Sequence, residues 1–166
     1  MIDGLTHGFD LGYKGEQGSQ RCNNNLTVNS NPGIAIAKVN KEIEFGRIGG
    51  PFQDAPFKHF KCSPLALREK STPGQYRLLH NLSHPHDDSA VNANIPSELT
   101  KTTYDTIEDA VEIIQHYDSP YLAKTDIAEA FRLLPLHPSS YNLTGFKLQG
   151  KYFYDKCLPM GEAVPA

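Results

Sequence analysis

The sequence predicts an α+β fold with an antiparallel sheet. Two stretches, residues 62–83 and 143–158, each contain two apolar or alternating segments separated by turn residues, which is typical of β-hairpins. Two other segments, residues 33–45 and 106–117, carry apolar residues at helical spacing. There is no internal repeat, and 166 residues correspond to about one domain at roughly 150 residues each.

Composition excludes several classes of protein. Hydrophobic residues make up 39% and charged residues 21%, with a net charge of -3, which is typical of a globular chain. No apolar run approaches the ~20 residues of a membrane span, and the N-terminus lacks a secretory signal. The three cysteines are too far apart to suggest a disulfide framework or a cysteine-based zinc site. We therefore expect an intracellular protein, in cytoplasm or nucleus, that contacts no membrane.

The first third of the chain is expected to be rich in loops. Residues 1–31 contain many glycines and asparagines and predict an extension that depends on other parts of the protein for its order. Residues 33–45 predict a helix, which Gly46, Gly49, Gly50 and Pro51 should end. Residues 53–60 predict an irregular crossing segment.

The hairpin at residues 62–83 carries two cations near its tip. Its turn is the Ser-Thr-Pro-Gly stretch at 71–74, with Lys70 before it and Arg77 after it. The two side chains can point at one anion, although these two residues taken alone favour a solvated hairpin tip. They belong to a basic segment, residues 58–77, which holds five basic residues and one acid.

The helix at residues 106–117 follows a polar connection, residues 84–103, of the kind that tends to be functional or mobile. Thr106 and Asp109 have the spacing of a capping box, and the apolar stripe begins at Ile107. Five acids and no Lys or Arg lie between residues 105 and 118. We expect a helix with one apolar face and a solvated acidic face.

Residues 121–126 predict a short buried strand that ends at Asp126. A carboxylate at the end of a core strand is costly unless it is paired or binds a cation, although it can also cap the following turn. A sharp turn at 127–131, an extended piece at 133–138 and a helical turn at 139–142 should follow. The second hairpin then reverses at Gln149-Gly150.

A cluster of metal-ligand residue types lies in the polar connection and just before it. Imidazole and carboxylate groups together suit zinc, manganese or iron. The spacing matches no established metal motif, so a solvated loop is the simpler interpretation and a metallohydrolase the functional one. The cluster consists of His80, His84, His86, Asp87 and Asp88.

Three ordered blocks of the sequence resemble reverse transcriptases. They are KCSPLALREKSTPGQYRLLHNLS, then NANIPSELTKTTYDTIEDAVEII, then YLAKTDIAEAFRLLPLHPSSYNLTGFKLQGKYFYDKCLPMG. The likeness is greatest to retrotransposons of the DIRS-like, tyrosine-recombinase class, where GFDLGYKG and EIEFGRIGGPF also have counterparts. It covers nearly the whole chain up to Gly161.

The resemblance implies a partial right-hand polymerase: fingers plus the first part of the palm, an antiparallel sheet with packed helices. Residues 1–56 would form a loop-rich N-terminal extension with one helix, residues 57–120 a fingers-like region and residues 121–166 a truncated palm. The implied reaction is template-directed DNA synthesis. Its partners would be an RNA or DNA template-primer and deoxynucleoside triphosphates, with Mg²⁺, or Mn²⁺, as cofactor.

The resemblance also implies roles for individual residues. Asp126 matches the first palm carboxylate, which binds both metal ions with help from the backbone carbonyl of Ile127. Lys70 and Arg77 match the cations that grip the triphosphate.

Five further positions would lie at the incoming nucleotide. The backbone N–H groups of Glu129 and Ala130 would face the triphosphate, and Phe131 would disfavour a 2′-hydroxyl. Met160 would lie near the sugar, where Gly161 allows close backbone approach. For Phe131 and Met160, core packing is the alternative.

One feature of the family is missing from the sequence. The second and third metal-binding carboxylates come as a paired-Asp hairpin after the LPMG motif, and no such pair follows it here. We therefore expect a reverse-transcriptase fragment that does not polymerise alone. The alternative is a non-catalytic nucleic-acid-binding remnant that retains the fingers.

Overall fold

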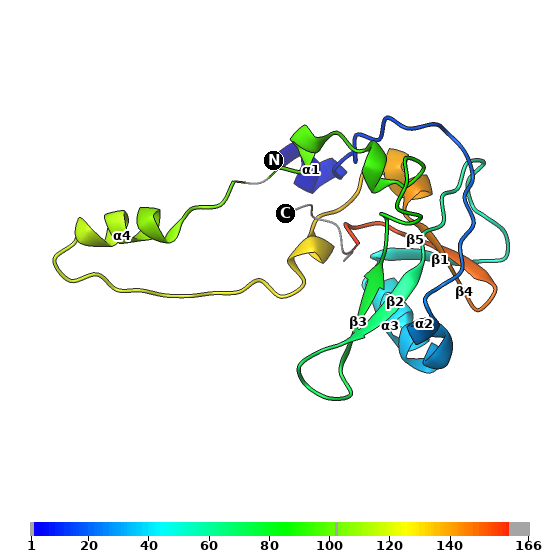
Figure 1. Ribbon diagram of the computed structural model, residues 1–166, viewed down its shortest axis with the longest axis horizontal. Coiled ribbons are helices and arrows are strands. Elements are labelled where there is room, and N and C mark those ends of the chain that lie inside the picture. Colours follow the sequence, from blue (N-terminus) through cyan, green and yellow to red (C-terminus); the bar gives the residue numbers. More distant parts are fainter. Residues whose placement is uncertain (1, 102, 160–166) are drawn as a thin grey trace.

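Two small antiparallel sheets and the helices that cover them form the body of the molecule, and one long arm leaves it (Figure 1). The computed structural model describes residues 2–101 and 103–159. The α-helices are α1 (Ile2–His7), α2 (Leu26–Ser30), α3 (Pro32–Glu44) and α4 (Ile107–Gln115). The strands are β1 (Ile48–Phe52), β2 (Leu65–Glu69), β3 (Tyr76–His80), β4 (Gly145–Leu148) and β5 (Lys151–Asp155). Short 3-10 helices are η1 (Asn92–Asn94), η2 (Ser97–Leu99), η3 (Ala130–Leu133) and η4 (Pro138–Leu143).

Both predicted hairpins are confirmed. β2 and β3 pair antiparallel around the 71–74 turn, and β4 and β5 pair around Gln149-Gly150. β5 also pairs with β1, so the larger sheet has the order β1-β5-β4. The α+β class with antiparallel sheets is therefore confirmed.

The main core lies between α2, α3 and the two sheets. Pro32 occupies the first turn of α3, where its missing N–H costs nothing, and Ala35 and Val39 then point into the core one turn apart. The cluster consists of Val28, Ala35, Val39, Ile48, Leu65, Leu67, Phe146, Leu148 and Phe153. α3 contacts β1 of the larger sheet and β3 of the hairpin, so it joins the two sheets.

The N-terminal region is more structured than the sequence predicts. Within the described residues, the first 56 positions contain three helices rather than one. The glycine-rich segment that was expected only to end α3 also contains strand β1. Gly49 makes that strand possible because the ring of Tyr154 lies where a Cβ would be. Residues 2–31 pack on the body at two places: Val28 is buried in the main core, and Leu11 is buried in a second cluster with Leu82, Val91, Leu136 and Leu143.

The predicted buried strand at residues 121–126 is wrong. These residues have no regular secondary structure, every one of them is exposed, and Tyr121 is fully accessible to solvent. A strand needs a neighbour that accepts and donates its backbone hydrogen bonds, and none of the described strands lies beside this segment. It instead forms one leg of the arm, with α4 at the far end (Figure 1).

The second predicted helix is confirmed in its position and its cap. The hydroxyl of Thr106 accepts from the N–H of Asp109, whose carboxylate accepts from the N–H of Thr106. Its apolar face, however, packs on nothing: α4 contains no buried residue. Each helix in the described part of the chain is too short or too polar to cross a bilayer.

Candidate nucleic-acid interface

The hairpin of β2 and β3 carries the two predicted phosphate-binding cations at exposed positions. Arg77 lies opposite Arg68 in the ladder, and Lys70 follows the last residue of β2. The N–H of Lys70 donates to the carbonyl of Gln75 at 2.7 Å, and the N–H of Gly74 donates to the carboxylate of Glu69 at 2.8 Å. These bonds stabilise the turn, so both cations project from an ordered tip.

Lys70 adjoins two cations of α3. Burial lowers the pKa of Lys38, and the positive charges of Lys70 and Lys41 lower it further. Lys38 therefore lies near both other cations, and we call the three residues the α3 basic patch (Lys38, Lys41, Lys70). The carboxylates of Glu129 and Glu42 also lie near Lys38 and act on its pKa in the opposite direction. Concentrated positive charge of this kind attracts phosphate groups.

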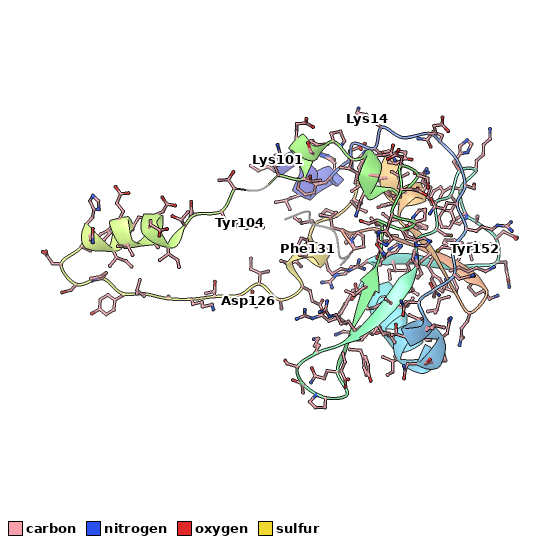
Figure 2. All side chains as sticks on the ribbon, in the orientation of Figure 1. Lys14, Lys101, Tyr104, Asp126, Phe131 and Tyr152 are labelled. Carbon is pink, nitrogen blue, oxygen red and sulfur yellow. The ribbon has the colours of Figure 1, made fainter. Side chains whose placement is uncertain are left out.

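The turn that should face a triphosphate lies at the base of the arm. Glu129 has a left-handed backbone (φ +56°), and its carboxylate lies 2.9 Å from a guanidinium nitrogen of Arg47. The hydrogen bond from Arg47 lowers the pKa of Glu129. Phe131 begins the return into the body and is 48% exposed (Figure 2). The side chain of Glu129 therefore attaches the turn to the body, close to the α3 basic patch.

A buried ionic network anchors Arg132, the residue after Phe131. Arg132 donates to the carboxylate of Asp155 at 2.6 Å and to that of Glu42 at 2.9 Å. The other carboxylate oxygen of Asp155 is 2.8 Å from Nδ1 of His80. Arg132, Asp155 and His80 are all buried, so the network connects η3, β5, β3 and α3 through the interior.

The sequence alone did not reveal this network. The alternating pattern of β5 gave one indication of a buried charge, because Asp155 lies on the same inward face of the strand as Phe153. A carboxylate on an inward face requires a buried partner, but the sequence does not say which. Both partners come from distant positions: Arg132 from η3 and His80 from β3.

Asp126 stands alone on the arm. It is exposed, and it lies on the leg of the arm that returns to the body (Figure 2). Within the described residues, no group of three or more His, Cys, Asp or Glu side chains is placed to hold a metal ion. The residues present around Asp126 and Ile127 therefore do not fit a metal site by themselves.

The histidine-rich cluster separates into two environments. His80 is buried in the ionic network, whereas the rings of His84 and His86 lie 6.2 Å apart in the connection after β3. His84 and Asp88 line an open pocket of about 510 Å³ together with the N-terminal segment. The metallohydrolase interpretation loses its basis, because the described part of the chain brings no three of these ligands together.

The remaining predicted site residues are not all described. Met160 and Gly161 lie outside the described residues. Ile127 and Ala130 are exposed beside Glu129. The roles of Lys70, Arg77, Asp126 and the 127–131 turn stay predictions.

Similarity to solved structures appears over almost the whole chain, although no family model and no curated protein matches its sequence. The native prototype foamy virus protease–reverse transcriptase aligns with a TM-score of 0.57 and 20% identity, over 92% of this chain and 18% of that one. A foamy viral protease–reverse transcriptase in complex with double-stranded DNA aligns with a TM-score of 0.56 and 17% identity, over 90% of this chain and 27% of that one.

These alignments show that the chain has a reverse-transcriptase-like fold. It spans about a fifth to a quarter of the length of the foamy virus chains that it matches.

Proposed function

We propose that this chain is the fingers and the first part of the palm of a retroelement reverse transcriptase, of the DIRS-like class. The observation that carries the proposal is the likeness to foamy virus reverse transcriptases over 90–92% of the chain. The order of the three sequence blocks supports the same assignment. In this proposal residues 57–120 act as fingers and residues 121–166 as the beginning of the palm.

The chain's own contribution is to hold phosphate groups of a template-primer and of a deoxynucleoside triphosphate. Arg77 offers a planar fork that matches a phosphate, and Lys70 adds a point charge from the other side of the turn. The α3 basic patch extends this charge toward the 127–131 turn, whose N–H groups at Glu129 and Ala130 complete the phosphate contacts. Phe131 selects deoxynucleotides, and the remaining sugar contacts are assigned by the resemblance alone to Met160 and Gly161, which lie outside the described residues.

The proposal assigns no catalytic step to the chain by itself. Two Mg²⁺ or Mn²⁺ ions need several oxygen ligands on a rigid support. Asp126 and the carbonyl of Ile127 supply only a part of such a set, and no paired-Asp motif follows them in the 166 residues. We therefore propose that the chain by itself binds nucleic acid but does not polymerise it. The alternative, a non-catalytic nucleic-acid-binding remnant, makes the same prediction.

Salt-dependent binding of oligonucleotides tests the proposal. The full chain is titrated into labelled single strands and primer-templates, and fluorescence anisotropy is recorded at several salt concentrations. Each phosphate contact contributes about 0.7–0.9 to the slope of log K against log salt. Arg77→Ala should therefore weaken binding and reduce the slope by about one.

Lys14→Ala is the matched control, because Lys14 is an exposed cation at the opposite end of the body (Figure 2). It should leave both the affinity and the slope nearly unchanged. Equal losses in the two variants, or binding that does not depend on salt, would contradict the assignment of the hairpin.

A primer-extension assay with Mg²⁺ or Mn²⁺ tests the absence of catalysis. We expect no extension by the purified chain. Extension that Asp126→Asn abolishes would overturn this part of the proposal and leave the binding part intact.

A further inference from the structure

The arm, residues 103–129, returns to the body at a carboxylate that lies among cations (Figure 1). The carboxylate of Glu129 is 2.9 Å from a guanidinium nitrogen of Arg47. The hydrogen bond from Arg47 lowers the pKa of this carboxyl, and the charges of Lys41 and Arg132 lower it further. One internal anion therefore lies within the positive surface that the proposed function assigns to phosphate groups.

Arg47 is held in place and still has hydrogen-bond donors to offer. Its carbonyl accepts from the N–H of Lys156 at 2.8 Å, and its guanidinium lies 5.0 Å from the centre of the Phe45 ring. A guanidinium has five N–H donors. Within the described residues it donates one hydrogen bond, to Glu129, and the carboxylate of Glu42 stays 3.8 Å away. Other donors of Arg47 thus remain open to an oxyanion.

The contact between Glu129 and Arg47 is one that a ligand can break. The Glu129 side chain is 45% exposed, and partly exposed ion pairs stabilise a protein only weakly. In the part of the chain that the structure describes, Arg47 is the one hydrogen-bond partner of this carboxylate. The backbone of Glu129 is also left-handed, at φ +56°, which a residue with a side chain adopts only at a cost. Glu129 therefore offers little resistance to a change of partner.

A phosphate group is the ligand chemistry that matches these surroundings. Its oxygens accept two parallel hydrogen bonds from an arginine, and a terminal phosphate carries more negative charge than a carboxylate. Lys38 and Lys41 of the α3 basic patch add to its attraction, whereas Glu42 is already engaged by Arg132 at 2.9 Å. The carboxylate of Glu129 would repel a phosphate at the same place. The phosphate and Glu129 therefore compete for the guanidinium.

We propose that Arg47 is a phosphate-binding residue whose place is taken by the carboxylate of Glu129 until a phosphate of the ligand displaces it. The ligand is a deoxynucleoside triphosphate or a nucleic-acid strand. In the free chain Glu129 neutralises the guanidinium, and in the bound chain the released guanidinium adds one cation to the α3 basic patch. The inference rests on the proposed function, because it concerns the same surface. It adds a binding residue and an internal competitor that the sequence resemblance does not contain.

Removal of the competing charge tests the inference. The full chain is titrated by fluorescence anisotropy with two probes, a labelled deoxynucleoside triphosphate and a labelled single strand. Glu129→Gln should tighten the binding of at least one probe by about three- to fivefold, which corresponds to the free energy of a partly exposed ion pair. Arg47→Gln should weaken the binding of the same probe. The probe that responds shows whether the phosphate belongs to the nucleotide or to the strand.

A double variant separates competition for Arg47 from a general effect of charge. If Glu129 acts by holding Arg47, then Glu129→Gln should give no gain in the Arg47→Gln chain, so the two substitutions are not additive. Glu44→Gln is the matched control, because Glu44 is an exposed acid at the end of α3 and the substitution changes the net charge equally. It should change the affinity by less than about twofold, since salt screens exposed charges. Urea unfolding of each variant verifies that the fold is retained.

Three results would overturn the inference and leave the proposed function intact. The first is an equal gain in Glu129→Gln and Glu44→Gln, a comparison that does not depend on the stability of Arg47→Gln. The second is a gain that persists without Arg47, because Glu129 would then repel the ligand directly. The third is a loss of binding in Glu129→Gln, because the ion pair would then position the turn. Absence of binding in the unaltered chain and in every variant would overturn the proposed function as well.

Discussion

The guanidinium of Arg132 lies 2.6 Å from the carboxylate of Asp155, and both side chains are buried in the interior of the body. Glu42 and His80 extend this pair to α3 and β3. The pair connects η3, at the end of the arm, to β5, and His80 extends the connection to the β2-β3 hairpin that carries the proposed interface. Its energetics lead to the first two predictions.

Removal of Arg132 should destabilise the fold strongly. Arg132→Met leaves the buried carboxylate of Asp155 without its cation, which typically costs about 3–5 kcal/mol. The free energy of unfolding, measured by urea denaturation, should fall by that amount. Asp3→Asn breaks the exposed pair with His7 instead and should change little. Equal effects of the two substitutions would contradict the buried network.

Acid should weaken the fold through Asp155. Burial alone would raise the pKa of this carboxyl, but the hydrogen bond with His80 and the charge of Arg132 lower it below its ordinary value of 3.8. The ionised group therefore stabilises the folded chain at neutral pH, and this contribution is lost as the pH falls below about 4. The unfolding free energy, measured at pH 7, 4 and 3, should decline with falling pH less steeply for Asp155→Asn than for the unaltered chain. A parallel decline in both proteins would show that other groups cause the acid sensitivity.

A methyl group at position 49 should distort β1. The Cβ of Gly49→Ala would overlap the ring of Tyr154, which should cost about 1–3 kcal/mol of unfolding free energy. Gly33→Ala is the control, because nothing lies within 4 Å of the corresponding Cβ in α3. That substitution should be neutral or stabilise the chain by up to about 1 kcal/mol. Similar melting temperatures for the two variants would argue against the close packing of β1 on β5.

Trypsin should cut the arm before the body. Lys124 is the only Lys or Arg between residues 103 and 129, and it lies in an exposed segment without regular structure. In dilute solution, mass spectrometry of a brief digest should show cleavage after Lys124 among the first products. Lys124→Gln should remove this product and leave the other early products unchanged. Initial cleavage within β2 or β5 would contradict the exposed arm.

Several elements could be predicted because neighbouring residues determine them. The capping box of Thr106 and Asp109 begins α4 as expected, and its spacing requires no distant partner. Turn residues at 71–74 and at Gln149-Gly150 positioned both hairpins. The predicted cations Lys70 and Arg77 lie on the first hairpin for the same reason.

Other features could not be predicted because they depend on distant partners. Residues 121–126 have the composition of a buried strand, yet no strand pairs with them and they remain exposed. Ile48–Phe52 has the composition of a turn, yet it pairs with β5. In both cases the neighbouring strand, rather than the local residues, decides whether a strand forms.

The amino-acid sequence by itself determined α3, α4, the hairpin turns and the acidic character of the arm, since these follow from residues close together along the chain. Only the tertiary structure decided that Arg132, Asp155, His80 and Glu42 meet in one buried network and that α4 lies uncovered. Burial arises from contacts between distant segments, such as Glu42 with Arg132, which are 90 residues apart. The spacing of residues along a sequence does not show which distant residues will come into contact.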